Sequence, residues 1–149
     1  MEREYALKAG FLYNFARYSD GDWFDPSVND AYTLCSPDAE FVRVAKQTLQ
    51  GQLVKSRPVS VIQVDSPSIQ CNSLFLTHAQ GHQFVNDVSF KHTMLVGQED
   101  GFAAKGGHIN FFIAGGKIRF EVSPDNLAKA GIKLSAKVLR IGRIVDGSK

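Results

Sequence analysis

The sequence predicts a single α/β domain over residues 1–149, in which helices flank a mixed β-sheet as a sandwich. Helical and strand patterns alternate along the first half of the chain, which is typical of α/β proteins. A hairpin signature then follows, because the apolar-rich runs 108–114 and 117–122 are joined by Gly115 and Gly116. A hairpin makes antiparallel neighbours, so the sheet is expected to be mixed rather than purely parallel. The length suffices for one hydrophobic core.

The N-terminal segment 2–18 has the periodicity of an amphipathic helix. Three apolar residues recur at every fourth position on its expected buried face: Leu7, Phe11 and Phe15. Glu4 and Lys8 are four residues apart and are expected to pair on the outer side of the helix. The loop that follows carries the only tryptophan, Trp23, which either covers an edge of the core or contacts a partner.

The middle of the chain alternates between short strands and helices. Expected strands lie at 32–35, 58–64, 74–76 and 93–96. Between the first two, a helix is expected with Ser36 as N-cap, Pro37 in the first helical position and an end at Leu49. A second, shorter helix is expected at 83–88.

The hairpin has the clearest pattern in the sequence. In its second strand Ile118, Phe120 and Val122 alternate with Lys117, Arg119 and Glu121, which predicts an apolar face on the core and a charged face on solvent or a partner. The first strand is apolar almost throughout, which is typical of a strand covered on both faces. We therefore expect the hairpin in the middle of the sheet, with these side chains mostly buried: Phe111, Ile113, Phe120 and Val122.

Two helices are expected after the hairpin. Ser123 and Pro124 cap and open a short helix that extends to about Ala130, and Gly131 ends it. The apolar spacing over 134–145 predicts a final amphipathic helix.

The charges are balanced and interspersed. Lys and Arg number 17 and Asp and Glu number 15, which gives a formal net charge of +2. This lacks the concentrated basic footprint of a nucleic-acid-binding domain. No apolar run approaches the ~18 residues of a membrane span, and no apolar segment of an export signal is present at the N-terminus.

No residue pattern points to catalysis or to a metal. His78 and His82 have a helical ligand spacing, but no acid between them completes a metalloprotease motif. The glycine-rich segment 101–108 lacks the order of a phosphate-binding loop and precedes a strand rather than a helix. We therefore expect no enzymatic activity, no metal and no cofactor.

The two cysteines, Cys35 and Cys71, are not in a zinc-binding spacing. The residues alone leave two interpretations open. Either both are buried free thiols, or they form one disulfide, which requires an oxidising compartment.

Several motifs in order resemble the YfiR family. They are KAGFLYNFARY, Trp23, YTLCS, CNSLFL, LVGQEDGFAAKGGHINF, KIRFEV and AGIKLSAKVLRIGR. The resemblance extends over nearly the whole chain. The chain departs from it in lacking the second cysteine pair of one member and in having Ser123 where Asn is common.

The resemblance implies a periplasmic, non-enzymatic regulator that represses a membrane diguanylate cyclase and so lowers cyclic di-GMP signalling. The implied partners are the periplasmic domain of a YfiN-like cyclase and an outer-membrane YfiB-like lipoprotein, with a homodimer left open. Family members are exported by a signal peptide, so we expect one to have been removed here. The resemblance also implies that Cys35 and Cys71 form a disulfide.

The resemblance further assigns a partner-binding surface to Glu121, Leu127 and Lys133, with Arg17 as a weaker member. An apolar anchor surrounded by charges is the usual anatomy of an interaction hot spot. The alternative is that the charges are ordinary solvated side chains worth less than ~1 kcal/mol each. A different function is also open, in which a cleft near Glu121 and Lys133 binds a nucleotide or an amino acid.

Overall fold

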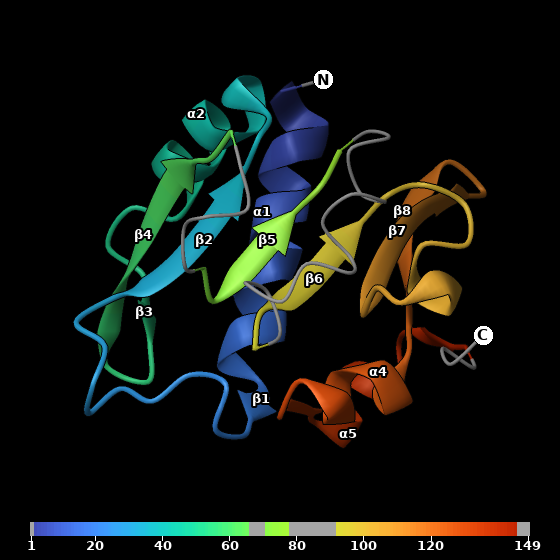
Figure 1. Ribbon diagram of the computed structural model, residues 1–149. Coiled ribbons are helices and arrows are strands. Elements are labelled where there is room, and N and C mark those ends of the chain that lie inside the picture. The colour runs from blue at the N-terminus through green and yellow to red at the C-terminus, as the bar shows by residue number, and fades with distance from the viewer. Residues whose placement is uncertain (1, 66–70, 78–91, 146–149) are drawn as a thin grey trace.

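The computed structural model describes residues 2–65, 71–77 and 92–145. Within them the main sheet has eight strands (Figure 1). In spatial order these are β10 (Arg143–Ile144), β8 (Lys117–Val122), β7 (Ile109–Ala114), β6 (Met94–Gly97), β5 (Ser73–Phe75), β2 (Tyr32–Ser36), β4 (Arg57–Gln63) and β3 (Leu53–Val54). Pairing is antiparallel between β7 and β8 and between β3 and β4, and parallel elsewhere. The expected mixed sheet in an α/β fold is confirmed.

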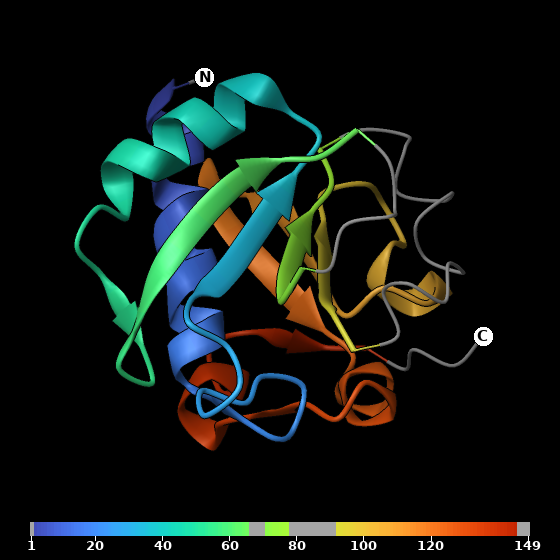
Figure 2. The same cartoon turned by 60° about the vertical axis from the view of Figure 1, so that its left-hand side comes forward.

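The two longest described helices lie on the same face of the sheet (Figure 2). The helical elements are α1 (Glu2–Arg17), α2 (Ala39–Thr48), the 3-10 turn η2 (Ala103–Lys105), α4 (Pro124–Lys129) and α5 (Ala136–Leu139). A separate two-stranded sheet pairs β1 (Ser19–Asp20) with β9 (Lys133–Leu134) and ties the end of α1 to the C-terminal part of the chain. The expected helix at 83–88 and the residues His78 and His82 lie outside the described residues.

Helix α1 is present as expected, but it is rotated relative to the predicted face. Its buried apolar residues are Tyr5, Ala9, Leu12, Phe15 and Ala16, whereas Leu7 is 53% exposed. Tyr5, Ala9, Leu12 and Ala16 are three or four positions apart, and Phe15 lies beside Ala16, which follows the 3.6-residue turn better than a strict spacing of four. Phe15 packs edge-to-face against Phe120 with ring centroids 4.8 Å apart, so α1 lies directly over the hairpin.

Lys8 is buried, which corrects the expectation of an outer ion pair. Its side chain is only 4% exposed, while that of Glu4 is 42% exposed. The ammonium group donates hydrogen bonds to Glu4 and to Oε1 of Gln98 at 2.7 Å. A buried ammonium group requires such partners, and here they connect α1 to the loop after β6.

Helix α2 begins later than the sequence predicts. Its N-cap is Asp38, whose carboxylate accepts a hydrogen bond from the backbone N–H of Phe41. Ser36 still belongs to β2, where it pairs with Gln63, and its hydroxyl accepts from the N–H of Asp38. Strand pairing therefore takes priority over the local capping signal at Ser36.

Cys35 and Cys71 form a disulfide, as the family resemblance implies, with Cα atoms 6.0 Å apart. Both are buried in a small apolar cluster on one face of the sheet: Cys35, Val64, Cys71, Leu74, Leu76, Leu95 and Phe102. Leu34, next to Cys35 in β2, and Phe75, next to Leu74 in β5, belong to the larger core on the opposite face, beneath α1 and α2. Because neighbouring side chains of β2 and β5 point to opposite faces of the sheet, these strands contribute apolar residues to both clusters.

The hairpin lies inside the sheet but toward one end of it, because β10 covers part of β8. Phe111, Phe120 and Val122 are buried, as expected. Ile113 is 59% exposed, so the expectation for that residue is wrong. It lies close to the Gly115–Gly116 turn, at the end of β7 where the side chains are less buried than at its start.

The expected final helix over 134–145 is wrong. Leu134 pairs with Ser19 in the two-stranded sheet, and α5 begins only after Ser135, whose hydroxyl accepts from the N–H of Val138. After the single helical turn, Arg143 pairs with Glu121 in β10. The amphipathic periodicity is real, but sheet pairing at both ends of the segment leaves room for one turn of helix.

Trp23 covers an edge of the core, so the first of its two interpretations is confirmed. The side chain is 5% exposed and packs near Phe24 and Tyr32. Its indole N–H donates to the carbonyl of Asn72 at 3.1 Å.

Candidate functional site

Glu121 occupies a buried polar centre on the sheet face opposite α1. Glu121 is only 6% exposed, although the alternating pattern of β8 predicts it on a charged face in contact with solvent or a partner. One carboxylate oxygen accepts from Nη2 of Arg143 at 2.6 Å and from its Nε at 3.2 Å. The other accepts from the side-chain amide of Asn110 at 3.3 Å. Strand register creates this arrangement, because β8 pairs Glu121 with Asn110 on one side and with Arg143 on the other.

The charge that this centre presents to solvent is therefore positive. The side chain of Arg143 is 61% exposed, whereas that of Glu121 is 8% exposed. The guanidinium also lies over the ring of Phe112, 4.3 Å from its centroid. The alternating pattern of β8 predicts Glu121 as an acid presented at the surface, and the exposed cation that covers it corrects that expectation.

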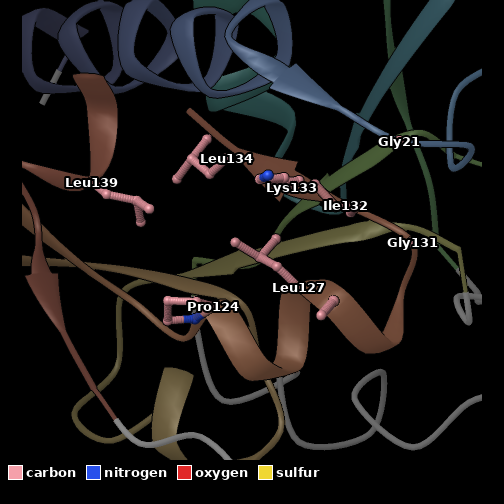
Figure 3. A pocket seen from close by; sticks show the side chains of 9 residues that line it. Gly21, Pro124, Leu127, Gly131, Ile132, Lys133, Leu134 and Leu139 are labelled. Carbon is pink, nitrogen blue, oxygen red and sulfur yellow. The ribbon is translucent and has the colours of Figure 1, made fainter. Parts of the chain in front are cut away.

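A pocket of about 430 Å³ lies between α4 and the segment that leads through β9 to α5. It is lined by Gly21, Pro124, Leu127, Ala128, Gly131, Ile132, Lys133, Leu134 and Leu139. Figure 3 shows the side chains of Leu127, Leu134 and Leu139 converging on the same space from different segments. Lys133 is the only charged residue of this lining and is exposed. The pocket is thus an apolar hollow with one cation at its rim.

Two glycines give this pocket its shape. Gly131 follows α4 with φ of 78°, a conformation that favours glycine. Gly21 has φ of 132°, and a Cβ there would clash with the carbonyl oxygen of Gly131. The β1–β9 pairing brings these two backbones together, and no other residue type would permit so close an approach.

The four residues assigned to a partner surface do not form one patch. Leu127 and Lys133 line the same pocket, but Leu127 is 1% exposed and forms its wall rather than a projecting anchor. Glu121 belongs to the separate centre with Arg143. Arg17 lies at the end of α1, where its guanidinium stacks on Tyr13 and Tyr18.

No local pattern indicates that Arg143 and Asn110 hold Glu121, because long-range strand register brings them together. The same is true of Gly21 and Leu139, which complete the pocket opposite Leu127. A local signal exists only for Gly131, which the sequence predicts as a helix stop and which also allows the chain to turn back over the pocket.

His108 lies in the sheet interior, immediately before β7. It is buried, and its Nδ1 accepts a hydrogen bond from the N–H of Leu95 at 2.9 Å. Burial lowers the pKa of His108 to about 4, because the charged imidazolium is poorly solvated there. The side chain is therefore a neutral structural acceptor at neutral pH.

The described residues contain no group of three or more His, Cys, Asp or Glu side chains able to hold a metal ion. In the same ranges, none of the helices combines the length and the apolar character that a membrane crossing requires.

The chain is thus a small α/β protein with an apolar pocket and an intramolecular disulfide, which suits an oxidising compartment. Residues 5–143 match the model of the YfiR/HmsC-like family, and the chain belongs to this family. Its members are periplasmic regulators of cyclic di-GMP signalling that act with a diguanylate cyclase. No curated protein matches the chain.

Proposed function

We propose that this protein binds the periplasmic domain of a YfiN-like membrane diguanylate cyclase and represses its synthesis of cyclic di-GMP, without catalysing a reaction itself. The observation that supports a binding role best is the apolar pocket beside α4, with Lys133 at its rim. Buried apolar pockets that accept one partner side chain are typical centres of protein interfaces.

The sequence suggested that Leu127 of this chain is an apolar anchor that enters the partner, whereas the pocket favours an anchor supplied by the partner. Leu127 is buried in the wall, so the apolar anchor would come from the cyclase and enter the pocket between α4 and α5. Lys133 would then face an acidic group of the partner at the rim.

Exposed positions of the lining allow a clean test. Ala128 and Lys133 are both exposed and line the pocket, whereas Lys129 is exposed and does not. We expect Ala128→Glu and Lys133→Glu each to weaken binding of the cyclase periplasmic domain by about tenfold or more, without a change in melting temperature. The matched control, Lys129→Glu, makes the same change of charge as Lys133→Glu and lies on the same helix as Ala128, and it should bind normally.

Binding is measured by titration calorimetry with the oxidised protein, and repression by the level of cyclic di-GMP in cells. Full binding and repression by folded Ala128→Glu and Lys133→Glu variants would place the interface elsewhere. Size-exclusion chromatography of the same samples reports a homodimer, and competition with an outer-membrane YfiB-like lipoprotein reports whether that protein shares the surface.

A second candidate function is a small-ligand sensor, and the size of the pocket favours it. A volume of about 430 Å³ lies within the range of ligand sites, and Lys133 suits a carboxylate or phosphate. A nucleotide or an amino acid in this pocket would set the affinity for the cyclase. Amino acids and nucleotides screened by thermal shift test this, with Leu139→Trp as the variant that fills the pocket. A ligand that raises the melting temperature of the unchanged protein and of Leu139→Trp equally would show that it does not bind in this pocket.

A further inference from the structure

The outer edge of β8 is only partly covered. Strand β10 pairs with Glu121 and Val122, and within the described residues no strand pairs on that side with the preceding part, 117–120. The carbonyl of Val122 accepts from the N–H of Val145 on this edge. Backbone groups along a strand alternate between its two edges, so the backbone N–H and C=O of Ile118 face the same open side.

A hollow of about 220 Å³ runs along this open edge. Its lining is Phe11, Lys117, Ile118, Arg119, Phe120 and Ile141. Neighbouring residues of β8 point to opposite faces of the sheet, so a hollow lined by all four residues of 117–120 borders the edge itself rather than one face. It adjoins a second hollow, of about 210 Å³, between α1 and α5, with which it shares Phe11, Phe120 and Ile141.

The two hollows combine an apolar floor with a cationic rim. Four cations line them, namely Lys117, Arg119, Arg17 and Lys137, and the described residues of the two linings include no acid. Ile141 is 69% exposed between them. Charged residues on an edge strand hinder pairing with strands of like charge, but the same residues favour a strand of opposite charge.

We propose that the open edge of β8 takes up an extended acidic segment of a protein partner, which adds to the sheet as a further strand beside Lys117–Phe120. Backbone hydrogen bonds from the edge would hold the segment, as in other cases of strand addition. Acidic side chains at alternate positions face Lys117 and Arg119, and apolar ones between them face Ile118 and Ile141. The segment therefore has an alternating acidic and apolar pattern.

The charges favour a different protein over a second copy of this chain. Two copies paired through this edge would place Lys117 and Arg119 of one beside the same cations of the other, which is unfavourable. The edge is also separate from the pocket beside α4, since the two linings share no residue. The inference therefore goes beyond the proposed cyclase binding and does not depend on it.

The test uses a model peptide as the probe, a fluorescein-labelled hexapeptide of alternating glutamate and valine, with the intact oxidised protein. Fluorescence anisotropy measures its affinity. We expect Lys117→Glu with Arg119→Glu to weaken binding by about tenfold or more, because the rim changes sign. The control variant Lys46→Glu with Lys129→Glu changes the net charge equally at exposed sites away from the edge and should change the affinity less than about twofold.

Two further peptides separate edge pairing from simple attraction. A peptide with the same side chains in which every backbone nitrogen is methylated has no N–H group for strand pairing at either edge and should lose binding. A lysine–valine peptide should not bind. Equal weakening in both double variants, or unchanged binding of the methylated peptide, would overturn the proposal. A third outcome would also overturn it. If the peptide does not bind, and if the protein forms a concentration-dependent dimer that Lys117→Glu with Arg119→Glu abolishes, the edge binds a second copy of the chain instead.

Discussion

Arg143 and Glu121 face each other across adjacent parallel strands, with Nη2 and the carboxylate oxygen 2.6 Å apart. The carboxylate is buried and the guanidinium largely exposed, so the pair fastens the short terminal strand β10 to the hairpin. Glu121 acts in this arrangement as an internal anchor for the C-terminal segment.

The first prediction concerns this pair. Arg143→Gln leaves the buried carboxylate without its cation, and we expect a loss of about 1–3 kcal/mol in the free energy of unfolding. Glu121→Gln in the same chain removes the unpaired charge and should restore most of that loss. Urea denaturation measures both. Arg140→Gln, at an exposed position nearby, should change stability by less than about 0.5 kcal/mol. Additive effects of the two substitutions would show that the pair is not coupled.

The second prediction concerns the core beneath α1. Phe120 is 3% exposed and packs on Phe15. Phe120→Ala should therefore reduce the free energy of unfolding by roughly 3–5 kcal/mol, because the vacated volume cannot collapse fully. The control is Ile113→Ala on the paired strand, where the side chain is exposed and a cost below about 1 kcal/mol is expected. Equal costs at the two positions would contradict the assigned core.

The third prediction concerns the disulfide, which joins residues separated by 36 positions. Removing it should reduce the free energy of unfolding by about 3–4 kcal/mol in the chain-entropy model, because the unfolded chain regains freedom. The measurement compares oxidised and reduced protein in urea, with Cys35→Ala plus Cys71→Ala as the control that a reductant should not affect. Thiol titration of the unreduced, denatured protein should find no free thiol, and two thiols would refute the bond.

The fourth prediction concerns the dependence of stability on pH. His108 has a pKa of about 4 in the folded protein, against 6.5 for the free side chain. Between these values the unfolded chain binds a proton that the folded protein excludes, so stability falls as the pH is lowered from 6.5 toward 4. The loss from this group should reach at most about 3 kcal/mol and level off below the folded pKa.

His108→Asn isolates this contribution. The side-chain oxygen of Asn can accept the N–H of Leu95 as Nδ1 does, but it does not titrate. The difference in unfolding free energy between the two proteins, measured over this pH range, should follow the titration of one histidine. A difference independent of pH would mean that the pKa of His108 is the same in the folded and the unfolded protein.

Local sequence signals predicted much of the fold. The hairpin follows from Gly115 and Gly116, which allow the tight turn, and from the alternation around Phe120. The cap at Ser123 and the stop at Gly131 bound α4 closely. The family motifs also implied the Cys35–Cys71 bond, which spacing alone left open. These features depend on residues close in sequence, or on a pattern that relatives share.

Other features depend on contacts that no local pattern encodes. Arg143 lies 22 residues after Glu121, and only the register of β10 on β8 decides that the two meet and that the acid is buried. The pairing of β1 with β9 similarly breaks the helical periodicity after Leu134 and brings Gly21 against Gly131 to form the pocket. The sequence alone thus determined the elements, their caps and the family, because short-range sterics and apolar periodicity specify them. The tertiary structure decided the burial of Glu121, the pocket and the open edge of β8, because these arise from strand register between distant segments.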